Sequence, residues 1–283
     1  SILSFQCAWL LNYYPECWTA AFLDKEPESR KEAAISLAQK HGFRIKNINI
    51  NTSTAQWEIA EDGKTLVQPF SSIKGLGDKA VEQIIRNRPY NTVEELLFND
   101  ASKLNKKSLD VLCRSGALDS LIDERFNGCK HFWMSCVQDR PKSTKKLEEK
   151  IKEYAAEQDF SIEEKIEHVS SLTGIFPFDL VMTKAIRESI SRYMVPSIGS
   201  WDKDLGVAWF IPREIIPKVT KNGKPYWIVK VIDDSSYSTS IKCWGVREGD
   251  EIHINRPYAA KLDHSEDWGF STRSIRHTFK LLG

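Results

Sequence analysis

The residues of this sequence best suited to chemistry form a short glycine-rich turn ahead of a helical pattern. The turn, from Ser72 to Lys79, reads SIKGLGDK, and an apolar periodic stretch follows from Ala80 to Asn87. Glycine has no Cβ and tolerates positive φ, so we expect both Gly75 and Gly77 to adopt positive φ and to let a ligand approach the backbone. Amide groups at such a turn and at a helix N-terminus attract anions, which predicts a phosphate-binding site.

Basic side chains surround this turn. Four basic residues flank it against two acidic ones: Lys74, Lys79, Arg86 and Arg88 against Asp78 and Glu82. A second helical pair follows from Leu104 to Leu118, and lysines gather at its entrance: Lys103, Lys106 and Lys107. The repeated pattern is typical of tandem helix-hairpin-helix motifs, which hold a duplex by its phosphates without reading its sequence. The alternative is that Gly-Leu-Gly only joins two helices. The residues expected to contact duplex DNA are Lys74, Gly75, Leu76, Gly77, Lys79, Arg86, Lys106 and Lys107.

The sequence changes character after Gly199-Ser200 and becomes rich in β-forming residues. Four such runs, separated by turn residues, extend over Val207 to Pro212, Tyr226 to Asp233, Ser238 to Trp244 and Glu251 to Leu262. Strands at this spacing predict a small closed antiparallel barrel. We interpret Asp233-Asp234, which precedes Ser-Ser, as turn residues rather than as metal ligands.

Basic residues cluster around aromatic residues in this β-rich segment. Such barrels bind single strands by stacking bases on exposed aromatic rings in a basic groove. The residues expected to contact a single strand are Arg213, Lys221, Lys224, Tyr226, Trp227 and Trp244. Because side chains alternate along a strand, one of Tyr226 and Trp227 should point inward and the other outward. The alternative, that these aromatic residues fill the core of a small barrel, stays open.

The elements upstream are predicted to be helical with small strands. Two helices are expected between Phe5 and Leu23, with Pro15 opening the second, and a third from Ser29 to His41 that ends at Gly42. Extended pieces follow over 44–50 and 56–70, the latter folded about the turn at 61–64. Between 126 and 172 the patterns predict polar helices, in which the charge run Lys145 to Lys150 forms a solvated helix face.

Composition excludes several classes of protein. The chain has 283 residues and a formal net charge of +1, which excludes a polybasic protein but not local phosphate contacts. The sequence contains no uninterrupted apolar run of about 18 residues, the length that a membrane-spanning helix needs, so no membrane span is predicted. Six cysteines are too few for a disulfide scaffold and fit a reducing cytoplasm. Cys129, His131 and Cys136 lack the spacing and the fourth ligand of a zinc site, so no metal or other cofactor is expected on this chain.

The order of these motifs resembles one family, the C-terminal half of bacterial-type family C replicative DNA polymerases, the DNA polymerase III alpha subunit. Ser4 to Leu10 with Tyr14-Pro15-Glu16 and 20–23 resembles the end of its fingers domain. Residues 71–81 resemble its helix-hairpin-helix signature, and Leu112 to Leu121 the end of that module. The segments 159–161, 164–165 and 172–177 resemble the linker before its OB domain, and 220–234 with 241–244 the central hairpin of the OB fold. We leave open whether the chain comes from a phage version of this polymerase or from a version divided into subunits.

The sequence also departs from this family. The family usually has a basic residue after Trp-Leu, where this chain has Leu11. Pro69-Phe70 stands where the family has Gly-Leu, and Ile175-Phe176-Pro177 where it has Gly-His-Pro. The family's catalytic palm aspartates lie upstream, and no clustered carboxylates here would hold Mg²⁺, which the resemblance assigns to the palm of the complete polymerase. Gln158-Asp159-Phe160 lacks the family spacing of a sliding-clamp motif, so a clamp partner is left open without a clear motif.

The prediction is therefore a multidomain α+β protein. We expect the end of a fingers domain over 1–55, a tandem helix-hairpin-helix module over 56–125, a helical linker over 126–200 and an OB-fold barrel over 201–283. The resemblance implies a DNA-binding, non-catalytic portion of a cytoplasmic DNA polymerase. Its expected partners are primer-template duplex, single-stranded template and the palm-bearing remainder of the enzyme. Because the chain opens at Ser1 inside a helical pattern, we expect a segment of a longer protein. The alternative is a non-enzymatic DNA-binding accessory protein of replication or repair.

Overall fold

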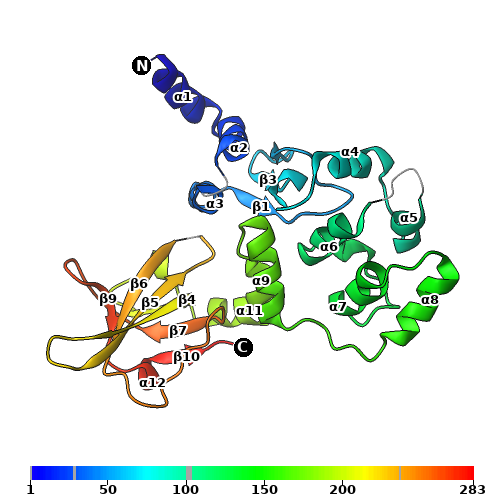
Figure 1. Ribbon diagram of the computed structural model, residues 1–283. Helices are drawn as coiled ribbons and strands as arrows, with labels where there is room; N and C mark the ends of the chain where they lie inside the picture. Colours follow the sequence, from blue (N-terminus) through cyan, green and yellow to red (C-terminus); the bar gives the residue numbers. More distant parts are fainter. Residues whose placement is uncertain (1, 28–29, 100–103, 236) are drawn as a thin grey trace. The chain divides into compact units, whose positions relative to one another are not determined.

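The computed structural model describes residues 2–27, 30–99, 104–235 and 237–283. The chain divides into two compact units, Ser1–Phe176 and Pro177–Gly283 (Figure 1). The first unit is mostly helical and the second is built on one sheet, so the mixed α+β class is confirmed. Among the described residues, no helix has the length and apolarity needed to cross a membrane.

The first unit begins with three helices and a small sheet. The helices are α1 (Ile2–Tyr13), α2 (Pro15–Lys25) and α3 (Lys31–Lys40), and the strands are β1 (Arg44–Lys46), β2 (Glu58–Ile59) and β3 (Thr65–Val67). Pro15 opens α2, and Gly42 follows α3 with φ of +88°, which confirms both predicted signals. The sheet order is β1-β3-β2, with β1 parallel to β3. Leu23, Trp57 and Leu66 pack in the core beneath these elements.

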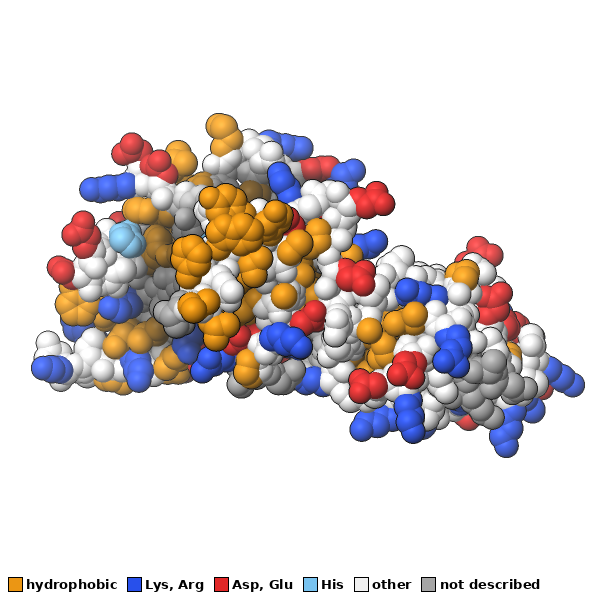
Figure 2. All heavy atoms as spheres, turned by 90° about the horizontal axis from the view of Figure 1, so that it is seen from above, with side chains coloured by type: hydrophobic (Ala, Val, Ile, Leu, Met, Phe, Trp, Pro, Cys, Tyr) orange, Lys and Arg blue, Asp and Glu red, His pale blue; other side chains and the backbone are white. Residues whose placement is uncertain are grey.

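Helix α1 carries no charged residue and buries none of its side chains. Its exposed apolar side chains include Ile2, Leu3, Phe5 and Trp9, and Phe5 is 71% exposed. The face seen in Figure 2 carries a broad group of hydrophobic side chains in this part of the molecule. An apolar hollow of about 550 Å³ lies alongside, and its lining includes Leu11, Trp18, Phe22, Leu37 and Phe43. A helix that is apolar all round normally lies inside a protein. The exposed apolar side chains of α1 are therefore typical of an interaction surface.

The remainder of the first unit is helical. A 3-10 turn, η2 (Phe70–Ser72), precedes α4 (Asp78–Asn87), α5 (Val93–Phe98), α6 (Lys106–Arg114), η4 (Asp119–Leu121), α7 (Cys129–Phe132), the π-helical η5 (Trp133–Gln138), α8 (Thr144–Glu153) and α9 (Ile162–Thr173). One hydrophobic core extends from Ile48 to Leu172 and includes Phe70, Ile84 and Leu112. This core crosses the expected boundaries at 55 and 125, and the four-module division stays a prediction.

Two minor predictions in this unit can be compared with the structure. The charge run lies on α8, where Lys146 pairs with Glu149 at 2.6 Å and Lys150 with Glu153 at 2.7 Å, so the predicted helix face is confirmed with i,i+3 spacing. His131 is buried in α7. Its ring accepts the amide N–H of Asn127 at Nδ1, 3.0 Å away, and lies 2.8 Å from the Ile151 carbonyl at Nε2. These contacts give His131 a packing role.

The second unit is a curled seven-stranded sheet with short helices. It contains α10 (Phe178–Val181), α11 (Lys184–Arg192), η6 (Ile198–Ser200), β4 (Val207–Val219), β5 (Pro225–Ile232), β6 (Ser238–Trp244), β7 (Tyr258–Lys261), β8 (Asp263–Ser265), β9 (Gly269–Thr272), α12 (Ile275–Thr278) and β10 (Phe279–Leu281). The strand order is β10-β7-β4-β5-β6-β9-β8. Of the strand pairings in the described residues of this unit, β6 with β9 is parallel and the others are antiparallel. Phe210, Val229 and Ile241 form its core.

The predicted β-rich run from Glu251 to Leu262 is wrong for most of its length. Only Tyr258–Lys261 forms a strand there, because Asn255 has φ of +62° and Pro257 follows without an amide hydrogen. Strands β8, β9 and β10 were not predicted. These strands are three or four residues long, which is too short for a clear alternating pattern.

Candidate nucleic-acid interface

The glycine turn is anchored on both sides by the core of the first unit. Ile73, only 2% exposed, lies in this core, and the amide of Leu76 donates to the Ile73 carbonyl at 3.2 Å to close the turn. The amide of Lys74 donates to the carbonyl of Leu172 in α9 at 2.9 Å. The turn is therefore held at the surface by apolar burial below and a backbone hydrogen bond beside it.

The two glycines of the turn differ, which corrects one prediction. Gly75 has φ of +86°, as expected. Gly77 has φ of −84° and ψ of 154°, an extended conformation open to any residue, so the prediction of positive φ is wrong there. A Cβ on Gly77 would meet no atom within 4 Å, whereas a Cβ on Gly75 would lie 3.6 Å from Lys107 Cε. Gly75 is required by the backbone, and Gly77 leaves open space above the turn.

Gly77 is also the N-cap residue of α4, where it offers no side chain to the helix amides. The amides of Ala80 and Val81 donate to the Gly77 carbonyl at 2.9 and 3.2 Å. Within the described ranges, the amides of Asp78 and Lys79 donate to no protein acceptor. Exposed N–H groups at a helix N-terminus, together with its positive dipole end, fit an anion such as a phosphate oxygen.

The second hairpin places its lysines beside this turn. Asn105 caps α6 by accepting the amide of Ser108 at 2.8 Å, so Lys106 and Lys107 form the exposed first turn of that helix. Lys106 Nζ donates to the Gln138 carbonyl at 2.9 Å, and Lys107 lies against Gly75. The structure therefore brings together residues of the two predicted hairpins. Lys103 lies outside the described residues.

The remaining predicted duplex residues lie on the surface of α4 and its turn. Lys74, Lys79 and Arg86 are exposed, Leu76 is half-buried, and Lys79 and Arg86 are two turns apart on one face of the helix. In the part of the chain that the structure describes, no carboxylate pairs with Lys79, Arg86 or Lys107. Arg88, by contrast, donates to the Ser53 carbonyl at 2.6 Å and has a structural contact.

Arg140 supports the second hairpin, a role that sequence reasoning missed. Its guanidinium donates to the carbonyls of Leu97 at 3.0 Å and Leu104 at 2.5 Å, which lie at the end of α5 and just before α6. Burial lowers the pKa of this guanidinium, which nonetheless stays charged at neutral pH. One side chain from the predicted linker thus holds both ends of the connection between two helices. No sequence pattern links Arg140 to carbonyl groups about 40 residues upstream.

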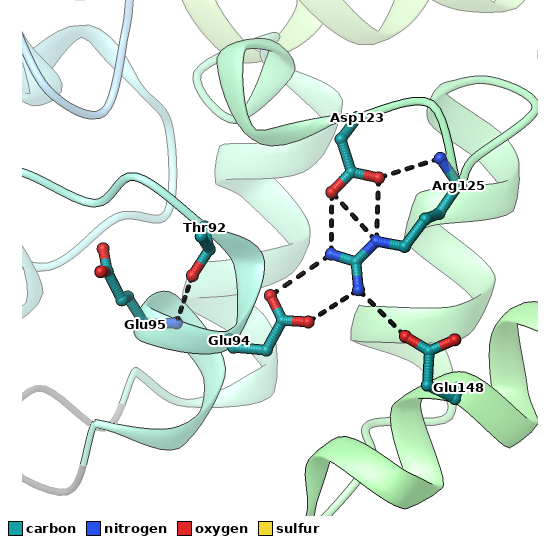
Figure 3. A network of polar contacts seen from close by, with 6 residues as sticks. All are labelled: Thr92, Glu94, Glu95, Asp123, Arg125 and Glu148. Carbon is teal, nitrogen blue, oxygen red and sulfur yellow. Dashed lines mark hydrogen bonds and ion pairs between the residues drawn. The ribbon is translucent and has the colours of Figure 1, made fainter.

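Arg125 joins three further segments of the same unit (Figure 3). Its guanidinium pairs with Glu94 at 2.7 Å, Asp123 at 2.8 Å and Glu148 at 3.0 Å. Hydrogen bonds from Arg125 hold the pKa of Glu94 and of Asp123 below their usual ranges. The figure shows the three carboxylates converging on one guanidinium from α5, from the segment after η4 and from α8. This network fixes the helices that carry the hairpin.

In the second unit, the predicted alternation of aromatic residues is observed. Tyr226 on β5 is the cross-strand partner of Trp244 on β6, and their rings stack at 4.6 Å with an interplanar angle of 29°. Trp227 is partly buried and packs against the core, so it does not share the outer face of Tyr226, and its contact with a single strand stays a prediction. The pleat of β5 turns Trp227 inward because it turns Tyr226 outward.

Lysines at the β4–β5 turn are exposed. The turn from Thr220 to Lys224 is closed by one backbone hydrogen bond, in which the Thr220 amide donates to the Lys224 carbonyl at 2.9 Å, and the Thr220 hydroxyl accepts the amide of Lys224 at 3.0 Å. Lys221 and Lys224 are exposed at this turn. Arg213 lies at a bulge in β4 and donates to the side-chain oxygen of Asn255. It is therefore partly engaged within its own unit.

Two residues missed by the sequence analysis extend this surface. Lys242 lies two residues before Trp244 on β6 and so on the same face. Its ammonium lies 4.6 Å from the ring centroid of Trp268, which is 66% exposed in the turn between β8 and β9. The period-two spacing could have indicated Lys242, and Asp267-Trp268-Gly269, where β9 begins, could have indicated an exposed turn.

Carboxylates that sequence reasoning examined have structural partners. Asp233 is fully buried and accepts the amides of Gly199, Ser235 and Tyr237, which confirms it as a turn residue. Asp159 accepts the amides of Lys130 and Phe160 and pairs with Lys165. Over the described ranges, no group of three or more potential metal-ligating side chains is present.

The comparisons with known proteins agree with the position of the hairpins. A family model described as a helix-hairpin-helix motif matches residues 42–127. DNA polymerase III subunit alpha of Pseudomonas aeruginosa is 27% identical over 164 residues, which is 56% of this chain and 14% of that protein. The same subunit of Helicobacter pylori is 31% identical over 134 residues, 43% of this chain and 11% of the relative. That of Escherichia coli K12 is 28% identical over 132 residues, 44% and 11% respectively. The central part of the chain is thus similar to a small part of these relatives.

Proposed function

We propose that this chain is a DNA-binding C-terminal portion of a replicative DNA polymerase of the DNA polymerase III alpha type. The observation that carries the proposal is the Gly75 turn packed against Lys107, since it joins two hairpins in the segment that matches the helix-hairpin-helix family. The similarity of that segment to alpha subunits from several bacteria supports the polymerase context.

The first unit would hold primer-template duplex by its phosphates. Amides at the start of α4 would donate to one phosphate, and the exposed charges of Lys79, Lys106 and Lys107 would neutralise its neighbours. Open space above Gly77 supports close approach of a strand. Contacts of this kind carry no sequence information, so binding would be tolerant of sequence and strongly dependent on salt.

The second unit would be an OB fold that meets single-stranded template. Three features support this fold: β4, β5 and β6 form a meander, β9 runs parallel to β6, and only Leu262 separates β7, which pairs with β4, from β8, which pairs with β9. A nearly continuous β7 and β8 would close the sheet on itself. The stacked Tyr226 and Trp244, with Lys221, Lys224 and Lys242 around them, would hold bases and phosphates.

Catalysis would belong to a palm-bearing polypeptide. The described carboxylates do not fit a two-metal centre, so no step through Mg²⁺ is assigned to this chain. The exposed apolar helix α1 and the hollow beside it are the surface proposed for docking to that polypeptide. We propose a cytoplasmic location by analogy with the similar alpha subunits. A sliding clamp remains an open partner, and Gln158 to Phe160 is not its proposed contact because Asp159 and Phe160 are used in packing.

The test is a pair of binding titrations by fluorescence anisotropy, one with primer-template duplex and one with single-stranded DNA, each over a salt series. We expect both affinities to fall steeply with salt, by about 0.9 log units per log unit of salt for each duplex phosphate contacted. A duplex affinity that is absent at low salt or independent of salt would contradict the grip model. Nucleotide incorporation by this chain alone would contradict the assignment of catalysis elsewhere.

The second candidate is a non-enzymatic DNA-binding accessory protein, which would bind duplex DNA through the same hairpins. It differs in the role of α1, since an accessory protein would not need a polymerase to cover that helix. If the chain belongs to a polymerase, the immobilised full chain should retain a palm-bearing polypeptide from the same genome. The double substitution Trp9→Asp and Leu10→Asp should then abolish this retention and leave duplex affinity unchanged. Unchanged retention would favour the accessory function.

A further inference from the structure

Two cysteine thiols lie in contact within the first unit and have no part in the proposed DNA binding. Cys113 is in the last turn of α6 and is 1% exposed, and Cys129 is the first residue of α7 and is half-buried. Their Sγ atoms are 3.9 Å apart. Cys136 is also buried nearby, whereas Cys243 lies in the other unit and Cys7 and Cys17 are exposed.

We propose that Cys113 and Cys129 form a reversible disulfide bond when the protein meets a peroxide, so that oxidation cross-links α6 to α7. A disulfide places its sulfur atoms about 2.05 Å apart, so the pair must approach by roughly 2 Å from its present contact. Two thiols already in van der Waals contact can close that gap by side-chain rotation and a small movement of the short helix α7. No other pair of described cysteines has a recorded Sγ to Sγ contact.

The chemistry would begin at Cys129, because it is the more accessible thiol. Its thiolate would attack one peroxide oxygen, giving a sulfenic acid and releasing hydroxide. Cys113 would then attack the sulfenic sulfur, forming the S–S bond and releasing water, with its thiol proton leaving in that water. The two electrons removed from the thiols reduce the peroxide. Hydrogen bonding to Cys129 and burial raise the pKa of the Cys113 thiol, which agrees with Cys113 as the resolving rather than the attacking residue.

Oxidation would close a loop that contains much of the support for the hairpin module. The residues between the two cysteines include the turn at Gly116, the short helix η4 and Arg125. Cross-linking them would reduce the freedom of the unfolded chain and fix the C-terminal end of α6. Lys106 and Lys107 lie about two helical turns away, at the other end of α6, so the bond would not block them. This inference does not depend on the proposed DNA binding.

The test uses the full chain with Cys7→Ser and Cys17→Ser, which removes the exposed thiols. After treatment with a small excess of hydrogen peroxide, the protein should lose the mass of two hydrogen atoms. Peptide mapping without reduction should recover Cys113 linked to Cys129. The midpoint of thermal unfolding should rise by about 5 °C or more and return to its original value after dithiothreitol.

Matched variants make the outcome decisive. Cys113→Ser and Cys129→Ser should each abolish the link and the thermal shift, while Cys243→Ser, another buried cysteine, should leave both unchanged. All four remaining thiols titrating under denaturing conditions after oxidation would overturn the proposal, as would a mapped link from Cys113 to Cys136. If a serine variant fails to fold, mass and peptide mapping of the unsubstituted background still decide the question.

Discussion

At the scale of single residues, Gly75 and Gly77 separate the demands of folding from those of binding. Both glycines stand in one turn, yet only Gly75 has a positive φ, and only its Cβ position is close to other side chains. The sequence does not distinguish them, because glycine occurs both where the backbone needs positive φ and where a ligand approaches the backbone closely. The structure assigns the backbone requirement to the first, and the proposed close approach of a phosphate would account for the second.

We predict that alanine affects stability at the first position and duplex binding at the second. Gly75→Ala should lower the free energy of unfolding by about 1 to 2 kcal/mol, since alanine is strained at positive φ. Gly77→Ala should leave the thermal midpoint unchanged but weaken duplex binding by roughly 1 kcal/mol, about fivefold, because its methyl group would stand between the α4 amides and a phosphate. Thermal unfolding and anisotropy measure the two effects. Undiminished duplex affinity of Gly77→Ala would remove the amide site from the proposal.

Trp268 is the residue-scale prediction for the second unit. Trp268→Ala should weaken single-strand binding by about 1 to 3 kcal/mol, the range for loss of one stacked base, and leave duplex binding unchanged. Tyr193→Ala is the matched control, since Tyr193 is a similarly exposed aromatic residue of the same unit. Equal effects of the two substitutions would mean that Trp268 has no specific role.

At the scale of elements, single arginines hold the hairpin helices in place. Arg140 bonds the carbonyls that flank the connection between α5 and α6, and Arg125 ties α5 to α8. Both come from regions that the sequence marked as linker or boundary. The hairpin module is therefore stabilised by helices that follow it in the chain, which explains why one hydrophobic core includes them all.

We predict that the Arg125 network makes stability sensitive to acid. The pKa values of Glu94 and Asp123 are lowered in the folded state, so their contribution is present above their unfolded pKa values of about 4.3 and 3.9 and is lost as pH falls through the folded values. Arg125→Gln should therefore lower the thermal midpoint most at pH 7, and the difference from the parent protein should shrink below about pH 4. A difference independent of pH would contradict the network's electrostatic role.

A second prediction at this scale concerns Arg140. Arg140→Gln should destabilise the connection between α5 and α6 because the Leu97 and Leu104 carbonyls lose their charged donor. Hydrogen exchange should increase at 104–109 and not in the second unit. Arg192→Gln, in the second unit, is the control and should leave exchange at these positions unchanged.

At the scale of the whole molecule, the near-zero net charge conceals local excess. The net charge of +1 arises because acidic residues offset the basic ones on elements such as α9, which carries Glu163, Glu164 and Glu167 against Lys165, while exposed lysines gather at the hairpin turn and at the β4–β5 turn. Binding depends on the local field, so the sum is a poor guide to partners. The two proposed DNA contacts lie in different units, so we expect a substitution in one unit to leave the ligand of the other unaffected.

The prediction at this scale is that charge removal in one unit affects one ligand. Lys107→Gln should weaken duplex binding and reduce its salt slope by about 1, with single-strand binding unchanged. Lys224→Gln should weaken single-strand binding and reduce its salt slope by about 0.7, with duplex binding unchanged. Lys184→Gln, at an exposed lysine of α11, is the control and should affect neither. Equal losses for both ligands from either variant would mean that the units bind as one site.

The sequence by itself determined the local features of this protein: the glycine turn, the helical patterns that become α4 and α6, the break at Pro15 and the β-rich character of the last segment. These depend on glycine and proline backbone limits and on apolar periodicity, which act between near neighbours in the chain. Only the tertiary structure decided that Gly77 is extended, that Trp227 faces the core, that Arg140 supports the hairpin and that Trp268 lies over Lys242. Each of these is set by contacts between residues far apart in the sequence, and local spacing carries no information about such contacts.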